Sequence, residues 1–146
     1  MPDSVSETVL KALFAALGEA MPVGTTLVRN ETIPTRIPQK GWVCLRDGDP
    51  GEPEVLLSPA TYIFDHLAEV DVVIELRGSD ARDELFDQLK QAVGAACAAD
   101  RTLGGLCDYV LGRAPEAAEV PVEGGENLKA ATIGIILTYA TSDPLA

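Results

Sequence analysis

The residues from Tyr62 to Leu76 alternate between two kinds of side chain. The even positions are mostly apolar: Tyr62, Phe64, His66, Ala68, Val70, Val72, Ile74 and Leu76. The odd positions include four acids, Asp65, Glu69, Asp71 and Glu75. A period of two predicts one β-strand with an apolar face and an acidic face. At about 3.3 Å per residue this strand would be roughly 50 Å long, whereas a usual strand has about 5–6 residues.

The length of this strand predicts that one small domain cannot cover its apolar face. The helix that we expect next, from Ser79 or Asp80 to about Ala99, would be only about 30 Å long at about 1.5 Å per residue. We therefore expect an apolar end of the strand that copies of the chain or other partners bury. This favours an assembly component over a self-contained enzyme with a pocket.

Three- and four-residue spacing of apolar side chains predicts a first helix from Ser6 to about Ala20. Short strands are expected at Thr25–Arg29 and Gly41–Arg46, and a long last strand at Leu128–Thr141. Another strand would begin near Cys107, be interrupted at Pro115 and continue toward Val120 or Val122. A tight connection is expected at Glu123–Asn127.

Two segments of the first half are predicted to lack regular structure. Pro34 and Pro38 exclude a helix interior or a central strand, so Asn30–Lys40 is expected to form an extended arm. The Asp-Gly, Asp-Pro and Pro-Gly pairs near residues 47–54 indicate a turn loop. The resulting order, α-β-β-β-α-β-β in one domain of residues 1–146, predicts an α+β fold with a mostly antiparallel sheet and both helices on one face.

Composition narrows the possible functions. The 146 residues carry a formal net charge of -12, which would repel nucleic-acid phosphate and anionic membranes. Such a chain is not expected to bind DNA specifically, but it can line a passage through which DNA moves. Met1–Glu7 has no basic region typical of a signal peptide, and Ala130–Ala140 is shorter than the about 20 residues that cross a bilayer. We expect synthesis in the cytoplasm.

Candidate chemistry is sparse. The three cysteines, Cys44, Cys97 and Cys107, are widely spaced and form no CxxC pair, so they are expected to be buried thiols rather than a disulfide or zinc site. His66 lies on the apolar side of the long strand and is interpreted as structural, and Asp47-Gly48-Asp49 as a turn rather than a calcium loop. We predict no catalytic residue, cofactor or metal. A small transferase using Cys44 or His66, or a ligand-binding domain, remains an alternative.

Charged residues near the arm, the turn loop and the long strand are the candidate interface with other subunits or a tube. Arginines flanking the arm could pair with the acidic strand face of a neighbouring copy, or they are simple surface charge. The candidates are Arg29, Asn30, Arg36, Arg46, Asp47, Asp49, Glu52, Asp65, Glu69, Asp71 and Glu75.

Several short sequence segments and the order of elements resemble those of the tail terminator, or tail completion, proteins of long-tailed bacteriophages and prophages. They are Arg29-Asn30 before the arm, Val43 to Asp49, Leu57-Ser58-Pro59, Ala99 to Leu106 and Tyr139-Ala140-Thr141. The segment Asp100-Arg101-Thr102-Leu103-Gly104-Gly105-Leu106 is the strongest of them.

The resemblance implies a ring, usually of six subunits, that caps the tail tube, stops its polymerisation and meets the head. The implied partners are the chain itself, the tail tube protein and a head–neck connector protein, with DNA only as passing cargo. The implied location is the bacterial cytoplasm during assembly and then the head–tail junction of the virion. A neck, head-completion or tail-tube-like protein is the structural alternative.

Overall fold

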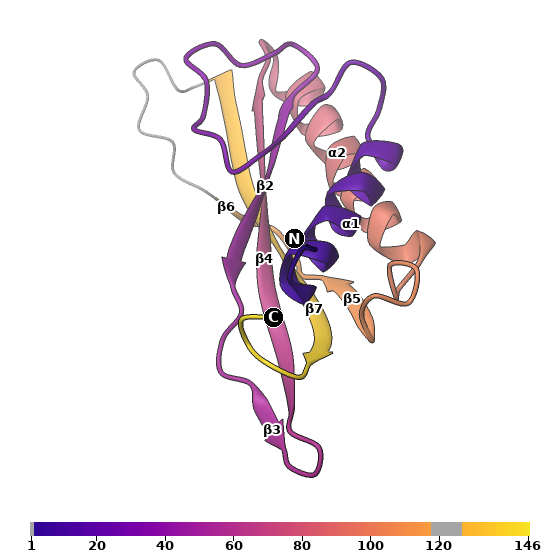
Figure 1. Cartoon of the computed structure of the whole chain (residues 1–146). Coiled ribbons are helices and arrows are strands. Elements are labelled where there is room, and N and C mark those ends of the chain that lie inside the picture. The colour runs from indigo at the N-terminus through magenta and orange to yellow at the C-terminus, as the bar shows by residue number, and fades with distance from the viewer. Residues whose placement is uncertain (1, 118–126) are drawn as a thin grey trace.

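A computed structural model describes residues 2–117 and 127–146 and has an α+β fold. Two helices, α1 (Val5–Ala20) and α2 (Ser79–Ala99), lie on one face of a sheet (Figure 1). The strands are β1 (Thr26–Arg29), β2 (Trp42–Asp49), β3 (Glu54–Leu56), β4 (Thr61–Glu75), β5 (Tyr109–Gly112), β6 (Glu116–Ala117) and β7 (Leu128–Thr141). The predicted fold class, with both helices on one face of a mostly antiparallel sheet, is confirmed.

The long strands β4 and β7 form the centre of the sheet. They pair antiparallel over their whole length, from Tyr62 opposite Thr141 to Glu75 opposite Leu128. The sheet order is β1-β2-β4-β7-β5, with β3 added to β4 and β6 added to β7. The last strand is confirmed at the predicted residues, and the long strand is shifted by one residue.

The predicted order of elements was incomplete in two places. It omitted the short strand β3 and counted β5 and β6 as one strand interrupted at Pro115, and it did not anticipate that β1 and β2 pair in parallel. Parallel neighbours need a long crossover connection, and the arm supplies it. Ile37 of the arm packs on the sheet face away from the helices, in a small second core with Trp42, Cys44 and Val73. The connection predicted at Glu123–Asn127 and the strand end near Val120 or Val122 lie outside the described residues, except Asn127.

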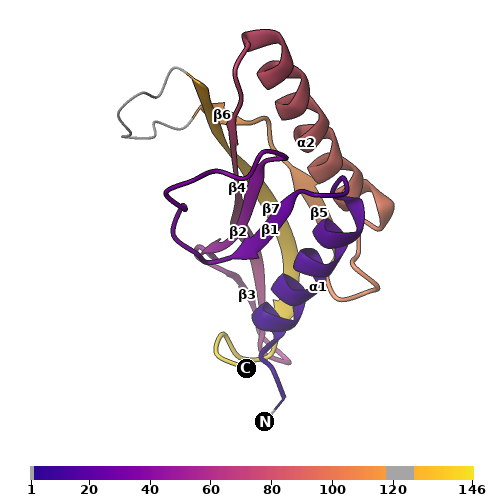
Figure 2. The same cartoon turned by 90° about the horizontal axis from the view of Figure 1, so that it is seen from above.

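The helices form where the apolar spacing predicted them. Ser4 caps α1, because its Oγ accepts a hydrogen bond of 3.2 Å from the N–H of Glu7. The apolar side chains of both helices are buried against the sheet: Val9, Leu10, Leu13 and Leu17 from α1, and Phe86, Leu89, Val93, Ala96 and Cys97 from α2. The helices lie side by side across this face of the sheet (Figure 2).

The expectation that the apolar face of the long strand would stay uncovered is wrong. Phe64, His66, Ala68, Val70, Val72 and Ile74 are all buried, within a core that the same chain completes. The prediction compared β4 only with the helix that follows it. The buried leucines of α1 belong to the same core as Phe64 and its partner Tyr139 in β7, so α1 and α2 together cover the strand.

Apolar surface is instead exposed on a hairpin. β3 pairs with the first residues of β4, and this β3–β4 hairpin projects beyond the helices at the bottom of Figure 1. Val55, Leu56 and Leu57 are 48%, 47% and 80% exposed. The chain therefore leaves its apolar surface uncovered at the tip of the hairpin and not along the inner face of β4.

The predicted turn at Asp47-Gly48-Asp49 is instead the end of β2. One extra residue on this strand, between Arg46 opposite Glu69 and Asp49 opposite Leu67, makes a β-bulge. Gly48 has a φ of 70°, and a Cβ there would lie 2.0 Å from the carbonyl oxygen of Leu67. The turn-forming residues Asp47, Gly48 and Asp49 form this bulge. Only residues 50–53 of the predicted loop therefore lie outside strands.

Candidate functional site

Arg29, Asn30 and Asp47, three of the predicted interface residues, form one network at the β-bulge. The Asp47 carboxylate accepts hydrogen bonds from Arg29 Nη2 at 2.8 Å and Asn30 Nδ2 at 3.0 Å. Arg29 also forms an ion pair with Glu7 in the first turn of α1. The network therefore ties α1 to the ends of β1 and β2.

Electrostatics within this network favour the charged forms. Burial alone would raise the pKa of the Asp47 carboxyl, but hydrogen bonds from Arg29 and Asn30 outweigh it and hold that pKa below its ordinary value. The Glu7 hydrogen bond raises the pKa of Arg29, although burial opposes it. Arg29 is thus held within its own chain rather than left to pair with a neighbour.

His66 is structural, as predicted, and both of its ring nitrogens are engaged. Nε2 contacts the backbone carbonyl of Asp47, which can only accept, so Nε2 carries the proton. Nδ1 therefore accepts from the Tyr139 hydroxyl at 2.8 Å. His66 is only 4% exposed, so this pair joins β4, β7 and the bulge inside the protein and leaves no ring nitrogen for a substrate or metal.

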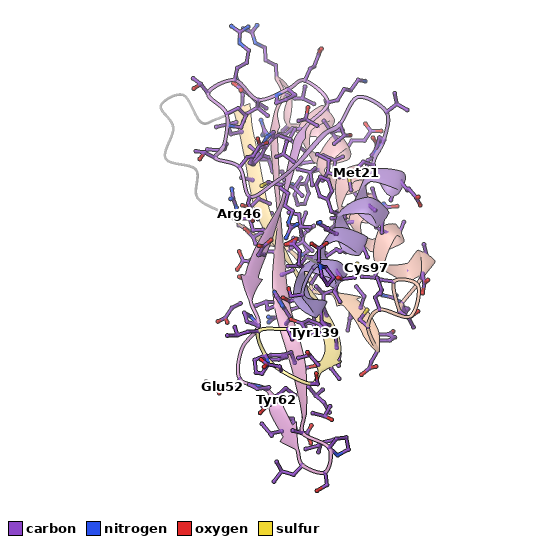
Figure 3. The ribbon with its side chains drawn as sticks, viewed as in Figure 1. Met21, Arg46, Glu52, Tyr62, Cys97 and Tyr139 are labelled. Carbon is purple, nitrogen blue, oxygen red and sulfur yellow. The ribbon has the colours of Figure 1, made fainter. Side chains whose placement is uncertain are left out.

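The acidic row of β4 lies on the sheet face away from the helices, and part of it is neutralised within the chain. Asp71 accepts from Arg46 Nε at 2.6 Å and from Thr132 Oγ1 at 2.8 Å. Asp65 accepts from Thr138 Oγ1 at 2.7 Å. In Figure 3, Arg46 lies on the side away from the helices and Cys97 lies among them. The acids that were candidates for pairing with a neighbour's arginine thus include Asp71, which binds an arginine of its own chain.

The remaining predicted residues do not join these networks. Glu69 lies between Arg46 and Gly134 in the register of the sheet. Arg36 and Glu75 line an open hollow where the arm meets the end of β4. Asp49 accepts from the N–H of Gly51, and Glu52 is exposed in the loop that leads to the hairpin. The eleven candidates are therefore spread over several surfaces and form no single site.

Sequence reasoning missed two exposed apolar surfaces. One is the hairpin tip. The signal in the sequence was a run of only three apolar residues, Val55 to Leu57, with turn residues on both sides, which is too short for a buried strand. The other surrounds β5, where Leu106, Tyr109 and Leu111 are 43%, 47% and 45% exposed. Apolar surfaces of this kind typically mark places where another molecule packs.

The Asp100–Leu106 segment is a loop ordered by its own side chains. The Asp100 carboxylate accepts from the N–H and hydroxyl of Thr102 and from the N–H of Gly104. These bonds, led by that of the Thr102 N–H, lower the pKa of Asp100. The residues that carried the resemblance most strongly thus have a local structural role in placing β5.

The thiols give no sign of reactivity. All three cysteines are free and buried, as predicted. Burial, together with Asp108 and Asp100, raises the pKa of Cys107 to about 11, and burial also raises that of Cys97. Within residues 2–117 and 127–146, no three His, Cys, Asp or Glu side chains gather closely enough to hold a metal ion. In the same ranges, neither helix is long and apolar enough to cross a membrane.

Comparison with known proteins identifies no family for this chain. The chain matches no protein-family model and none of the curated proteins.

Proposed function

We propose that this chain is a structural phage assembly protein that forms a ring on the end of a tail tube, stops tube polymerisation and provides the surface that joins the head. The observation that carries the proposal is the β3–β4 hairpin, which extends beyond the helix-covered body with Val55, Leu56 and Leu57 exposed. Placing apolar side chains on a projecting element suits a protein that packs against other subunits.

The inner face of β4 gives this proposal no support, because the chain covers it. Support comes instead from apolar surface on two short outer strands, β3 and β5. In the proposal the partners are copies of the chain, usually six, the tail tube protein and a head–neck connector. DNA passes the ring without specific binding, because a net charge of -12 per subunit repels phosphate. The protein would move from the bacterial cytoplasm to the head–tail junction of the virion.

Deleting the coding sequence from the phage or prophage that carries it tests the proposal. We expect tails of uncontrolled length in electron micrographs, and restoration of uniform length when the wild-type chain is supplied in trans. As a control, the Val23→Glu variant supplied in trans should also restore uniform length, because Val23 is 99% exposed and lies outside both apolar surfaces.

Two other outcomes would contradict the terminator role. Tails of normal length on heads that lose DNA would favour the neck or head-completion function. Particles that are unchanged in both respects would leave the chain without a role in tail assembly.

A further inference from the structure

Most of the exposed apolar side chains fall into two groups. Residues 2–117 and 127–146 expose eight large apolar side chains, and six of them belong to these groups. The tip group is Val55, Leu56 and Leu57 on the hairpin, and the edge group is Leu106, Tyr109 and Leu111 around β5. The other two, Val23 and Leu145, lie apart in the sequence from both groups.

The two groups lie at opposite edges of the sheet. β3 pairs with β4, β4 with β7, and β7 with β5, so β3 and β5 are the outer strands. They are offset along β4: Val55 and Leu56 of the tip group are opposite Tyr62 and Thr61, whereas Tyr109 and Leu111 of the edge group are level, through Thr138 and Ile136, with Asp65 and Leu67. One copy therefore keeps its two groups apart, while a second copy shifted along the strand direction would bring its tip group to the edge group of the first.

Strand directions permit this arrangement with all copies in the same orientation. Each pairing in the series β3, β4, β7 and β5 is antiparallel, so β3 and β5 run in opposite directions. β3 of one copy would then lie antiparallel to β5 of the next. Such a contact joins two different surfaces, and repetition of a contact of this type produces a ring or a filament.

Charge complementarity favours the same pairing. Glu52 and Glu54 are exposed beside the tip group, whereas Arg101 and Arg113 flank the edge group. The Arg101 guanidinium lies 5.5 Å from the Tyr109 ring, and Arg113 lines an apolar groove of about 390 Å³ between α2 and β5. These cations stand out in a chain with eleven Lys and Arg residues against twenty-three acids.

Acids also lie near the edge group, so the charge complementarity is partial. Asp100 stays charged but its carboxylate is turned into its own loop, Asp108 is exposed, and Glu69 and Glu116 line a small hollow with Arg113. The Val110 carbonyl is already taken, since Arg101 Nη1 donates to it at 3.0 Å. Side-chain packing and ion pairs would hold such a contact, together with any backbone pairing of β3 with the rest of the β5 edge.

We propose that the tip group of one copy docks on the edge group of a second copy, with Glu52 and Glu54 facing Arg101 and Arg113. This head-to-tail contact rests on the self-association in the proposed function and names the surfaces that make it. Every copy donates its hairpin to one neighbour and receives the hairpin of another.

Two charge-introducing variants test this contact. Leu57→Glu damages the tip group and Leu111→Glu the edge group, and both side chains are exposed enough that folding, checked by circular dichroism and thermal melting, should be unchanged. Sedimentation would be measured in about 0.3 M NaCl, where repulsion between acidic copies is screened. We expect wild type and Val23→Glu to form oligomers, and each test variant to associate at least about tenfold more weakly.

Mixing the two variants is the decisive measurement. A Leu57→Glu copy keeps an intact edge group and a Leu111→Glu copy keeps an intact tip group, so the mixture should form dimers with one copy of each and grow no further. A mixture that stays monomeric, or a wild-type chain that stays monomeric at all concentrations, overturns the proposed contact.

The outcomes separate this contact from the proposed function. Mixed dimers together with normal tails after gene deletion would support the contact and reject the tail function. Uncontrolled tail length together with wild-type association of both variants would reject the contact alone.

Discussion

The inner face of β4 and the tip of the β3–β4 hairpin belong to one continuous stretch of chain, yet they differ completely in burial. Val70 and Val72 are 0% exposed under the helices, while Leu57 is 80% exposed only a few residues before β4 begins. The difference shows that strand length alone does not reveal where apolar surface is left open. What matters is whether another element of the chain reaches each part of the strand.

Truncating one leucine beneath the helices, Leu137 opposite His66 of β4, and one at the tip should separate the two regions most strongly. Leu137→Ala, in the buried face of β7, should lower the free energy of unfolding by about 2–5 kcal/mol, because it leaves a cavity beneath the helices. Leu57→Ala at the tip should change it by no more than about 0.5 kcal/mol. Urea unfolding at a protein concentration too low for association measures both. Similar losses for the two variants would mean that the hairpin is packed in the monomer.

The β-bulge lies opposite the middle of β4, between Leu67 and Glu69, and Gly48 should be essential to it. Gly48→Ala should lower the free energy of unfolding by about 1–2 kcal/mol because of the positive φ. The variant should lose about 1–3 kcal/mol more because the new Cβ would meet the Leu67 carbonyl. Gly51→Ala is the matched control, because Gly51 also has a φ of 70° but has no atom within 4 Å of the added Cβ. Equal losses in thermal and urea unfolding would contradict a tight bulge.

Acid should weaken the network at the bulge by a smaller amount. The folded chain holds the pKa of Asp47 below its unfolded value, so the stability from this carboxylate is present above about pH 4 and lost as the pH falls through the folded pKa. Asp47→Asn should flatten this part of the pH dependence. Its cost at pH 7 should stay below about 1 kcal/mol, because the ion pair with Arg29 is partly exposed to solvent.

Urea midpoints at pH 7 and at about pH 3.5, on either side of the unfolded pKa, measure the effect. Glu52→Gln is the control, since Glu52 makes no ion pair among the described residues. An unchanged pH dependence in Asp47→Asn would show that this network does not couple folding to protonation.

Local patterns predicted most of the elements and little of the candidate site. The alternation in β4 and the spacing in α1 and α2 placed the strand and both helices within one residue, because these periods depend only on nearby residues. The turn prediction at Gly48 failed because the same residue types serve turns and bulges, and only the opposite strand distinguishes them. Arg46 was a candidate either for pairing with a neighbour or for simple surface charge, but Asp71, twenty-five residues away in the chain, binds it.

The sequence by itself determined which side of each strand and helix is apolar, the buried state of the cysteines, the structural role of His66 and the strongly acidic charge. Only the tertiary structure decided that α1 completes the cover over β4, that the arm makes β1 and β2 parallel, and that apolar surface stays open on β3 and β5. The physical reason is that periodicity is a property of neighbours in the chain, whereas burial and exposed edges depend on elements that folding brings together from as far apart as α1 and β7.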